Sequence, residues 1–354
     1  MPPSSIHFNG GINLVDAETV MREVASRVPA GVRRMPDGET GERQQWVWFQ
    51  LAKLWETPGI EKAGTIDQTT GYEQMPKVRL TPGVDPDSVE WPDLGYAEAY
   101  AQSFQIFRRL QEAGTIPSGV RFQVEYPTPL ATINTWVVAE DQERLEPAYE
   151  RALFADLDRL IGRLPHEAIA VQWDVAVEIG ILERAFEAGP GQNFDAIVDR
   201  LVRCAGRVPR DVPVGLHLCY GDYQHSHYKE PESLELQVRL ANGVTSGSQR
   251  SINWIAFTVP QYQRASAYFA PLGELRVPPD TELNFALVPY HPAQQEPGTT
   301  GEQVRLIDEH LASRPDGYPG QWGICTECGM ARAEREEIPQ LLDLHREILA
   351  RYGA

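Results

Sequence analysis

The sequence lacks any apolar run long enough to cross a membrane, and it contains only four cysteines in 354 residues. A membrane-spanning helix needs about 20 predominantly apolar residues, so we expect no embedded segment. Residues 1–8 show neither the basic start nor the apolar stretch of a secretory signal. We therefore expect a cytoplasmic protein, in which thiols stay reduced and cysteines serve metal binding or reactivity more often than disulfides.

Positive charge is also scarce, with 32 Lys and Arg against 50 Asp and Glu and a formal net charge of −18. Such a surface repels the phosphates of nucleic acids and anionic lipids. We therefore expect no nucleic-acid or membrane partner, and a small molecule as the substrate. The composition leaves the oligomeric state open, with a homodimer among the alternatives.

What the sequence does contain is a regular alternation of short apolar segments and amphipathic helical patterns. The clearest segment, 168–179, is almost continuously apolar, as expected for a parallel strand covered on both faces. Residues 57–95, rich in Gly, Pro, Thr and Asp, interrupt the pattern and predict an insertion with a short hairpin near 72–80. Strands that alternate with helices predict βαβ units, and eight of them fit a closed barrel. We thus predict an α/β fold, a single (β/α)8 TIM barrel over residues 1–354, with strands within 5–13, 31–39, 121–126, 168–179, 214–222, 252–259, 282–289 and 321–328.

A His-x-Cys pair stands near the end of the fifth predicted strand. Successive side chains of a strand point to opposite faces, so His217 and Cys219 face the same way. An imidazole and a thiolate are two of the ligands that zinc prefers. Cys328, at the end of the eighth strand, supplies a third, whereas Cys325 points away if that strand continues. The alternative interpretation of these residues is core packing, the commoner reason for such a pair.

Further polar residues fall at the carboxyl ends of strands, where barrels of this type place their active sites. We expect Asp174 and His291 to be catalytic, His291 as a proton carrier unless it is a plain loop residue. Asp174 must in any case be paired or solvated, because a buried lone charge is very costly. The expected substrate contacts are Asn9, Gly10, Asp37, Glu39, Gln172, Glu178, His225 and His227. Turn formation and helix capping are the alternatives for Asp37 and Glu39, and a solvated loop is the alternative for the two histidines.

The order of these motifs resembles the catalytic barrel of cobalamin-independent methionine synthase, in the superfamily that it shares with uroporphyrinogen decarboxylase. Residues 216–220 are similar to the family's His-x-Cys zinc motif, and 328–332 to its distal Cys-Gly motif. Residues 171–174 resemble its Gln-x-Asp strand, whose aspartate binds the amino-acid substrate, and 290–292 the segment with its proton-donating histidine. The resemblance implies a barrel with Zn²⁺ as cofactor, bound by His217, Cys219 and Cys328.

The sequence departs from that family at two places. Thr258 stands where the family has a fourth, glutamate zinc ligand, and residues 9–11 replace its Gly-Ser element. Water, the substrate, or another carboxylate such as Glu327 or Glu178 would then fill the fourth position. The first hypothesis is a zinc-dependent transferase that moves a methyl or other alkyl group to a thiol. The rivals are a zinc-dependent lyase or hydrolase acting on a small secondary metabolite, and a metal-free barrel or binding protein.

Overall fold

The protein is described by a computed structural model that covers residues 2–63, 75–222, 226–315, 318 and 320–353. Its centre is an eight-stranded sheet in the order β1-β10-β9-β8-β7-β6-β5-β2, with every neighbouring pair parallel. The two outer strands meet, because Ile6 pairs with Val32 and its N–H donates to the Gly31 carbonyl at 2.9 Å. The strands therefore follow one another round a barrel in chain order, and the predicted TIM-barrel fold is confirmed.

The strands of the barrel are short, and they are shortest where the two ends of the sheet meet. The two strands that meet there have two residues each, whereas β5 and β6 have seven. The eight strands are β1 (Ser5–Ile6), β2 (Arg34–Met35), β5 (Arg121–Pro127), β6 (Ile169–Val175), β7 (Val214–Leu218), β8 (Trp254–Phe257), β9 (Glu282–Ala286) and β10 (Trp322–Cys325).

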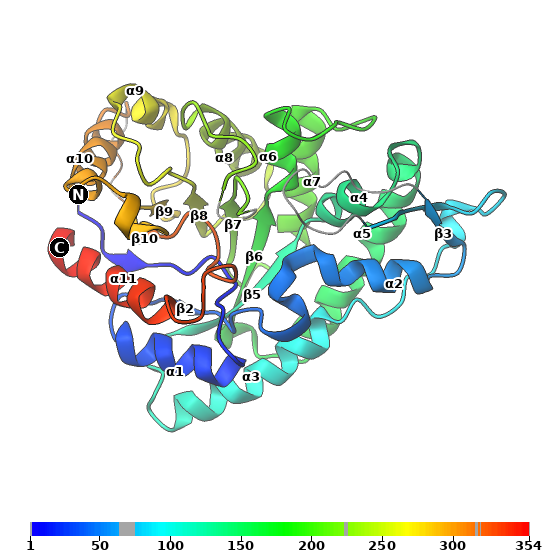
Figure 1. Ribbon diagram of the computed structural model, residues 1–354, viewed down its shortest axis with the longest axis horizontal. Helices are drawn as coiled ribbons and strands as arrows, with labels where there is room; N and C mark the ends of the chain where they lie inside the picture. The colour runs from blue at the N-terminus through cyan, green and yellow to red at the C-terminus, as the bar shows by residue number, and fades with distance from the viewer. Residues whose placement is uncertain (1, 64–74, 223–225, 316–317, 319, 354) are drawn as a thin grey trace.

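Helices surround the sheet and bury its outer face (Figure 1). Their bounds are α1 (Ala17–Arg27), α2 (Gln50–Glu56), α3 (Tyr96–Glu112), α4 (Pro129–Trp136), α5 (Ala139–Ile161), α6 (Val177–Leu182), α7 (Phe194–Arg207), α8 (Glu235–Gly247), α9 (Ser266–Phe269), α10 (Thr299–Ala312) and α11 (Ile338–Tyr352), with 3-10 turns η1 (Gly41–Phe49), η2 (Pro86–Ser88), η3 (His166–Ala168), η4 (Ala270–Glu274) and η5 (Pro292–Gln294). Among the described residues, none of these helices is both long and apolar enough to cross a membrane.

The fourth predicted strand is too long at its carboxyl end. Strand β6 stops at Val175, and the apolar residues that follow begin helix α6 at Val177. Glu178 therefore lies on a helix, and the prediction of a strand that extends through residue 179 is wrong at this end. A short apolar run fits a buried strand and a buried helix equally well, so periodicity alone does not separate them.

The insertion predicted near 57–95 contains an antiparallel hairpin of β3 (Ile60–Ala63) and β4 (Lys77–Leu80). It projects at one end of the molecule, beside α2 (Figure 1). Residues 64–74, between the two strands, lie outside the described part of the chain. The hairpin is tied to the barrel through β4, since Val78 pairs with Val137 just after α4.

The barrel interior is polar at the amino-terminal ends of its strands. Arg34 begins β2 and Glu282 begins β9, and their side chains form a buried ion pair at 3.0 Å. The Arg34 guanidinium also lies 4.3 Å over the Trp254 ring, and Ser5 Oγ donates to Glu282 at 3.0 Å. Burial alone would raise the pKa of Glu282, but the guanidinium outweighs it and lowers that pKa to about 2. This carboxylate is therefore held charged inside the barrel.

Candidate metal centre and active-site cavity

The imidazole of His217 is held on one side and left open on the other. Parallel pairing sets Asp174 of β6 directly beside His217 of β7, and His217 Nδ1 lies 3.2 Å from Asp174 Oδ1. The other ring nitrogen, Nε2, is buried and has no hydrogen-bond partner among the described residues. A buried polar atom without a partner is costly. A histidine held by a carboxylate on one nitrogen and free on the other is the usual form of a metal-ligating histidine.

The two cysteines meet although 109 positions separate them. Cys219 Sγ and Cys328 Sγ lie 3.5 Å apart, and the Gly221 N–H donates to Cys219 Sγ at 3.2 Å. Strand β10 ends at Cys325, and the chain then turns so that Thr326 Oγ1 donates to the Cys328 carbonyl at 2.6 Å. Two thiolates bound tetrahedrally at about 2.3 Å would stand about 3.8 Å apart. The observed spacing of the sulfurs is close to that value.

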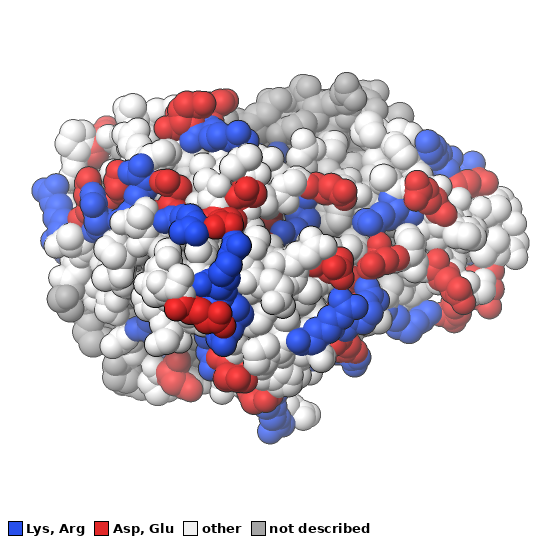
Figure 2. Space-filling model, turned by 90° about the horizontal axis from the view of Figure 1, so that it is seen from below, with Lys and Arg blue, Asp and Glu red and all other residues white. Residues whose placement is uncertain are grey.

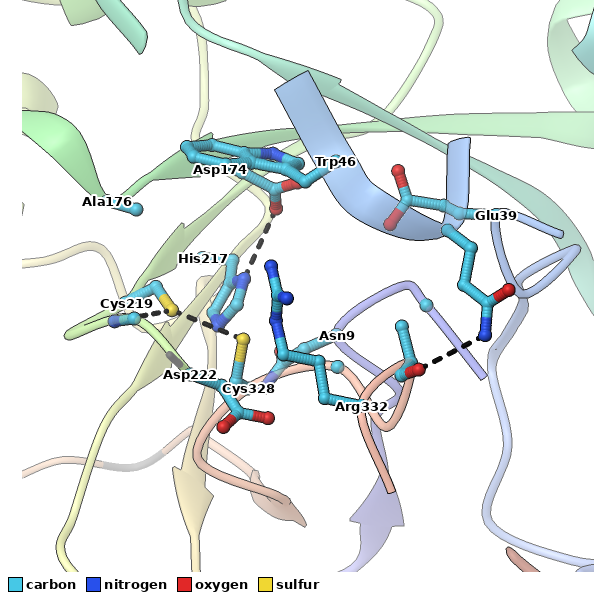
Figure 3. Close-up of a pocket in the computed structure, with 15 residues that line it drawn as sticks. Asn9, Glu39, Trp46, Asp174, Ala176, His217, Cys219, Asp222, Cys328 and Arg332 are labelled. Carbon is cyan, nitrogen blue, oxygen red and sulfur yellow. Dashed lines mark hydrogen bonds and ion pairs between the residues drawn. The ribbon is translucent and has the colours of Figure 1, made fainter. Parts of the chain in front are cut away.

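These residues fit a zinc ion in chemistry and in place. Figure 3 shows His217, Cys219 and Cys328 around one cavity, and all three line it. Hydrogen bonding with Cys219 and burial raise the pKa of Cys328 well above its ordinary value, so this group stays a thiol until a cation favours the thiolate. Among the described residues, no three His, Cys, Asp or Glu side chains already stand in a finished metal array. A bound ion would have to draw the imidazole toward the thiol pair.

The residues considered for a fourth ligand are engaged elsewhere. Thr258 donates its hydroxyl to the Leu218 carbonyl at 2.9 Å, and it lies 3.2 Å from the Glu327 carbonyl. The Glu327 carboxylate accepts from the Gln261 N–H at 2.6 Å and pairs with His227 at 2.6 Å. Glu178 is fully buried and accepts a hydrogen bond from Thr128, outside the cavity. Thr258, Glu327 and Glu178 are thus each held by other partners.

Three carboxyl groups crowd the floor of this cavity. Glu39 and Asp174 line it, and Gly10 separates Glu39 from the fully buried Glu125. A Cβ at Gly10 would lie 3.1 Å from Glu39 Oε2 and 3.5 Å from Glu125, so a larger residue would not fit. Burial raises the pKa of Glu39 to about 8, with the Asp174 charge as the second cause, and burial likewise raises that of Glu125. A cation bound there would let all three ionise.

Two residues of the cavity wall have strained backbones. Glu39 has φ 47° and Trp46 has φ 53°, in the left-handed region that favours glycine. Trp46 interrupts the η1 turn with non-helical angles, and it lines the cavity together with Glu39. Non-glycine residues persist in this conformation only where the surroundings enforce it, and such residues cluster at functional sites.

The remaining expected substrate contacts support this cavity from behind. Asp37 is fully buried, pairs with Arg43 at 2.6 Å and accepts the Glu39 N–H at 2.9 Å. Gln172 donates to Asp174 Oδ1 at 3.0 Å, while Asn9 lines the cavity itself and donates to the Thr326 carbonyl at 2.7 Å. These contacts place Asp37 and Gln172 behind the lining carboxylates.

The expected histidines divide differently. His291 and His227 line a second cavity, which shares Gly221, Asp222 and Cys328 with the first. His227 is held between Glu327 at 2.6 Å and Glu230 at 3.2 Å. His225 lies outside the described residues.

Three residues of the site were not expected from the sequence. Glu125 stands in the buried strand β5, as Asp174 does in β6, and a carboxylate in such a strand was a usable signal. Asp222 lines both cavities, and its Oδ2 is buried without a hydrogen-bond partner in the described structure. Trp46 lies at a kink in η1, and nothing in its sequence neighbourhood reveals that kink.

Comparisons with known proteins place the fold. No protein-family model and no curated protein matches the sequence. Among solved structures, a protein from Listeria monocytogenes, provisionally named a vitamin-B12-independent methionine synthase, is 12% identical, with a TM-score of 0.54 over 94% of this chain and 86% of its own. A B12-independent methionine synthase from Shewanella sp. W3-18-1, in complex with selenomethionine, is 11% identical, with a TM-score of 0.61 over 99% and 98%. At these identities the chain shares the barrel fold of proteins named as methionine synthases.

Proposed function

We propose that this protein is a zinc-dependent transferase that moves a methyl or other alkyl group onto a thiol substrate. The observation that carries the proposal is the thiol pair at 3.5 Å beside an imidazole nitrogen that has no hydrogen-bond partner. His217, Cys219 and Cys328 would hold the ion. Zinc in a sulfur-rich site favours the deprotonated form of a coordinated thiol, which is a good nucleophile toward an alkyl carbon.

The protein's own residues would bind and orient the thiol substrate. Asp174 orients His217 through the contact at 3.2 Å, and together with Glu39 it presents carboxyl groups to the cavity. A substrate with an ammonium group would relieve the crowding that raises the pKa of Glu39 to about 8. The cavity, about 590 Å³ including its open part, suits a small molecule. The selenomethionine in the Shewanella structure is a compound of this kind.

Proton handling falls to the second cavity. His291 lines it together with Cys328, so the imidazole would stand near a group transferred at that sulfur. In that place it would donate a proton to a basic leaving group, as a general acid.

A second function uses the same residues differently. Thr258, which stands where the family resemblance places a glutamate ligand, is tied to two backbone carbonyls and has no carboxylate to offer a metal. That position can also take water, which favours a zinc-dependent hydrolase or lyase acting on a small metabolite.

The test is thioether formation by zinc-replete protein with homocysteine or cysteamine and a methyl donor, compared with 2-mercaptoethanol, which lacks the ammonium. We expect methylation of the ammonium thiols at the higher rate, and its loss in Cys328→Ser. Cys325→Ser is the matched control, because that thiol is buried and lies outside the lining of the cavity. Hydrolysis of added esters or amides without any thioether would instead favour the second function.

A further inference from the structure

The second cavity adjoins the first at Cys328 and has a distinct chemical character. It shares Cys328 with the first cavity, and its wall is built from the loops after β7, β8, β9 and β10. A compound bound there reaches the same sulfur-rich centre as a compound in the first cavity, from a separate side. Two substrates of one transfer reaction need this relation, because donor and acceptor must meet end to end.

Negative charge is in excess in this cavity. Its described lining contains the three carboxylates of Asp222, Glu230 and Glu327, against the two imidazoles of His227 and His291. Burial would lower the pKa of His227, but its two glutamate partners raise that pKa to about 10. The positive charge of His227 is therefore already paired with Glu230 and Glu327. Asp222 Oδ2 is buried, and burial followed by the Asp222 charge raises the pKa of Tyr290, so this carboxylate lies beside an aromatic ring of the cavity.

Aromatic side chains accompany these carboxylates. Tyr262 and Tyr290 line the cavity, and Tyr262 is held in place by donating its hydroxyl to Glu230 at 2.6 Å. The Tyr262 side chain is otherwise exposed, with 54% of its surface accessible. Aromatic faces beside carboxylates attract cations that are too poorly hydrated for a simple ion pair, above all sulfonium and quaternary ammonium groups.

We propose that the second cavity binds an alkyl donor whose transferable group sits on a sulfonium or quaternary ammonium centre. This inference rests on the proposed function. In the transfer, the bond between the alkyl carbon and the positive sulfur or nitrogen breaks, and a bond forms between that carbon and the substrate thiolate. The leaving thioether or tertiary amine departs uncharged. The charges of thiolate and onium cancel, and the leaving group needs no proton, so this class of donor does not use the general-acid role proposed for His291.

The experiment compares choline with its uncharged carbon analogue 3,3-dimethylbutan-1-ol in titration calorimetry of the purified protein. We expect choline to bind at least about 10-fold more tightly. Asp222→Asn should weaken choline binding at least fivefold and leave the alcohol unaffected. Glu235→Gln, which removes an exposed carboxylate at the start of α8, outside the cavity, is the matched control. Tyr262→Leu tests the aromatic contribution at an exposed position that the fold tolerates.

Equal binding of the two compounds, or an unchanged choline affinity in both Asp222→Asn and Tyr262→Leu, overturns the cation site. Release of dimethyl sulfide from trimethylsulfonium and a thiol by zinc-replete protein supports the donor role, and its absence while choline binds overturns that role. The zinc content of the same preparation separates this inference from the proposed function. Cation preference without bound zinc contradicts the transferase and leaves the cation site standing, whereas bound zinc without cation preference does the reverse.

Discussion

Asp174 contacts His217 through one ring nitrogen, and this contact determines which nitrogen faces the cavity. With Nδ1 occupied, Nε2 is the atom available to a metal, as in other carboxylate-supported histidine ligands. Sequence parity predicted that His217 and Cys219 share a face, but it gave no partner for the imidazole. The partner follows from strand register, which sets Asp174 beside His217 and which the sequence of either strand alone does not encode.

The first prediction concerns this support. Asp174→Asn keeps the shape of the side chain but weakens its hold on the Nδ1 hydrogen. We expect zinc affinity to fall roughly 10- to 100-fold while the stoichiometry at saturation stays the same. Competition with a chromogenic chelator measures it. An affinity equal to that of the wild type would show that the carboxylate does not position the ligand.

The second prediction concerns Glu39, whose pKa burial raises to about 8. A carboxyl that stays protonated in the fold but ionises in the unfolded chain makes the protein less stable as pH rises from about 4.5 to about 8. Glu39→Gln removes that loss, so the variant should gain stability over the wild type at pH 8, on the order of 3 kcal/mol, and little at pH 4.5. Urea unfolding at both pH values tests this.

Glu112→Gln serves as the control for that experiment, because Glu112 is exposed at the end of α3. Its effect should not change with pH. A gain in Glu39→Gln that is the same at both pH values would contradict a raised pKa for Glu39.

At the scale of elements, strand β7 needs a glycine at position 215 in order to pack against β8. A Cβ at Gly215 would lie 2.1 Å from the ring of Trp254 on β8, which pairs with it. The glycine thus gives the indole room to lie against the backbone beside His217. The sequence predicted the strand from its apolar residues, but the need for this glycine became visible only when β8 was placed beside it.

The third prediction is that Gly215→Ala destabilises the protein by about 1–3 kcal/mol through overpacking. Gly206→Ala on α7 is the matched control, since nothing lies within 4 Å of its Cβ position. Alanine there should be neutral or stabilising by up to about 1 kcal/mol, because glycine is a poor helix former. Thermal unfolding of both variants gives the comparison, and equal effects would contradict the packing argument.

Element boundaries show where sequence reasoning stops. All eight barrel strands were predictable, because parallel strands covered on both faces read as apolar runs. The end of β6 was not, since the apolar run continues into α6. The hairpin was expected near 72–80, and β4 lies there, but its partner β3 comes from 60–63. Glu125 was missed for a related reason, because only the barrel geometry brings it to Gly10 and Glu39.

At the scale of the whole molecule, the barrel has polar groups at both ends, and the two groups shift carboxyl pKa values in opposite directions. Arg34, at the amino-terminal ends of the strands, lowers the pKa of Glu282 to about 2. Burial and the neighbouring carboxyl groups at the opposite end raise the pKa of Glu39. The Arg34–Glu282 ion pair stabilises the fold above about pH 4.5, and this contribution is lost as pH falls toward 2. Stability should therefore decline on both the acid and the alkaline side.

The fourth prediction follows from the Arg34–Glu282 ion pair. Glu282→Gln leaves Arg34 buried without its partner charge, so we expect a loss of about 3–5 kcal/mol at pH 7. The difference from the wild type should shrink as pH falls below about 4, because the wild-type carboxyl then also becomes protonated. A pH series of urea unfolding midpoints measures this, and a difference that stays constant down to pH 2.5 would rule out the ion pair as its cause.

The account as a whole depends on residues from two distant strands binding one metal ion. The most direct measurement is zinc content by elemental analysis, with zinc-edge X-ray absorption, on wild-type, Cys328→Ser and Cys325→Ser proteins. We predict one zinc per chain, with two sulfur ligands at about 2.3 Å and the rest nitrogen or oxygen at about 2.0 Å. This zinc should be lost in Cys328→Ser and retained in Cys325→Ser. A wild-type zinc content far below one per chain, or zinc retained with two sulfur ligands in Cys328→Ser, would contradict it.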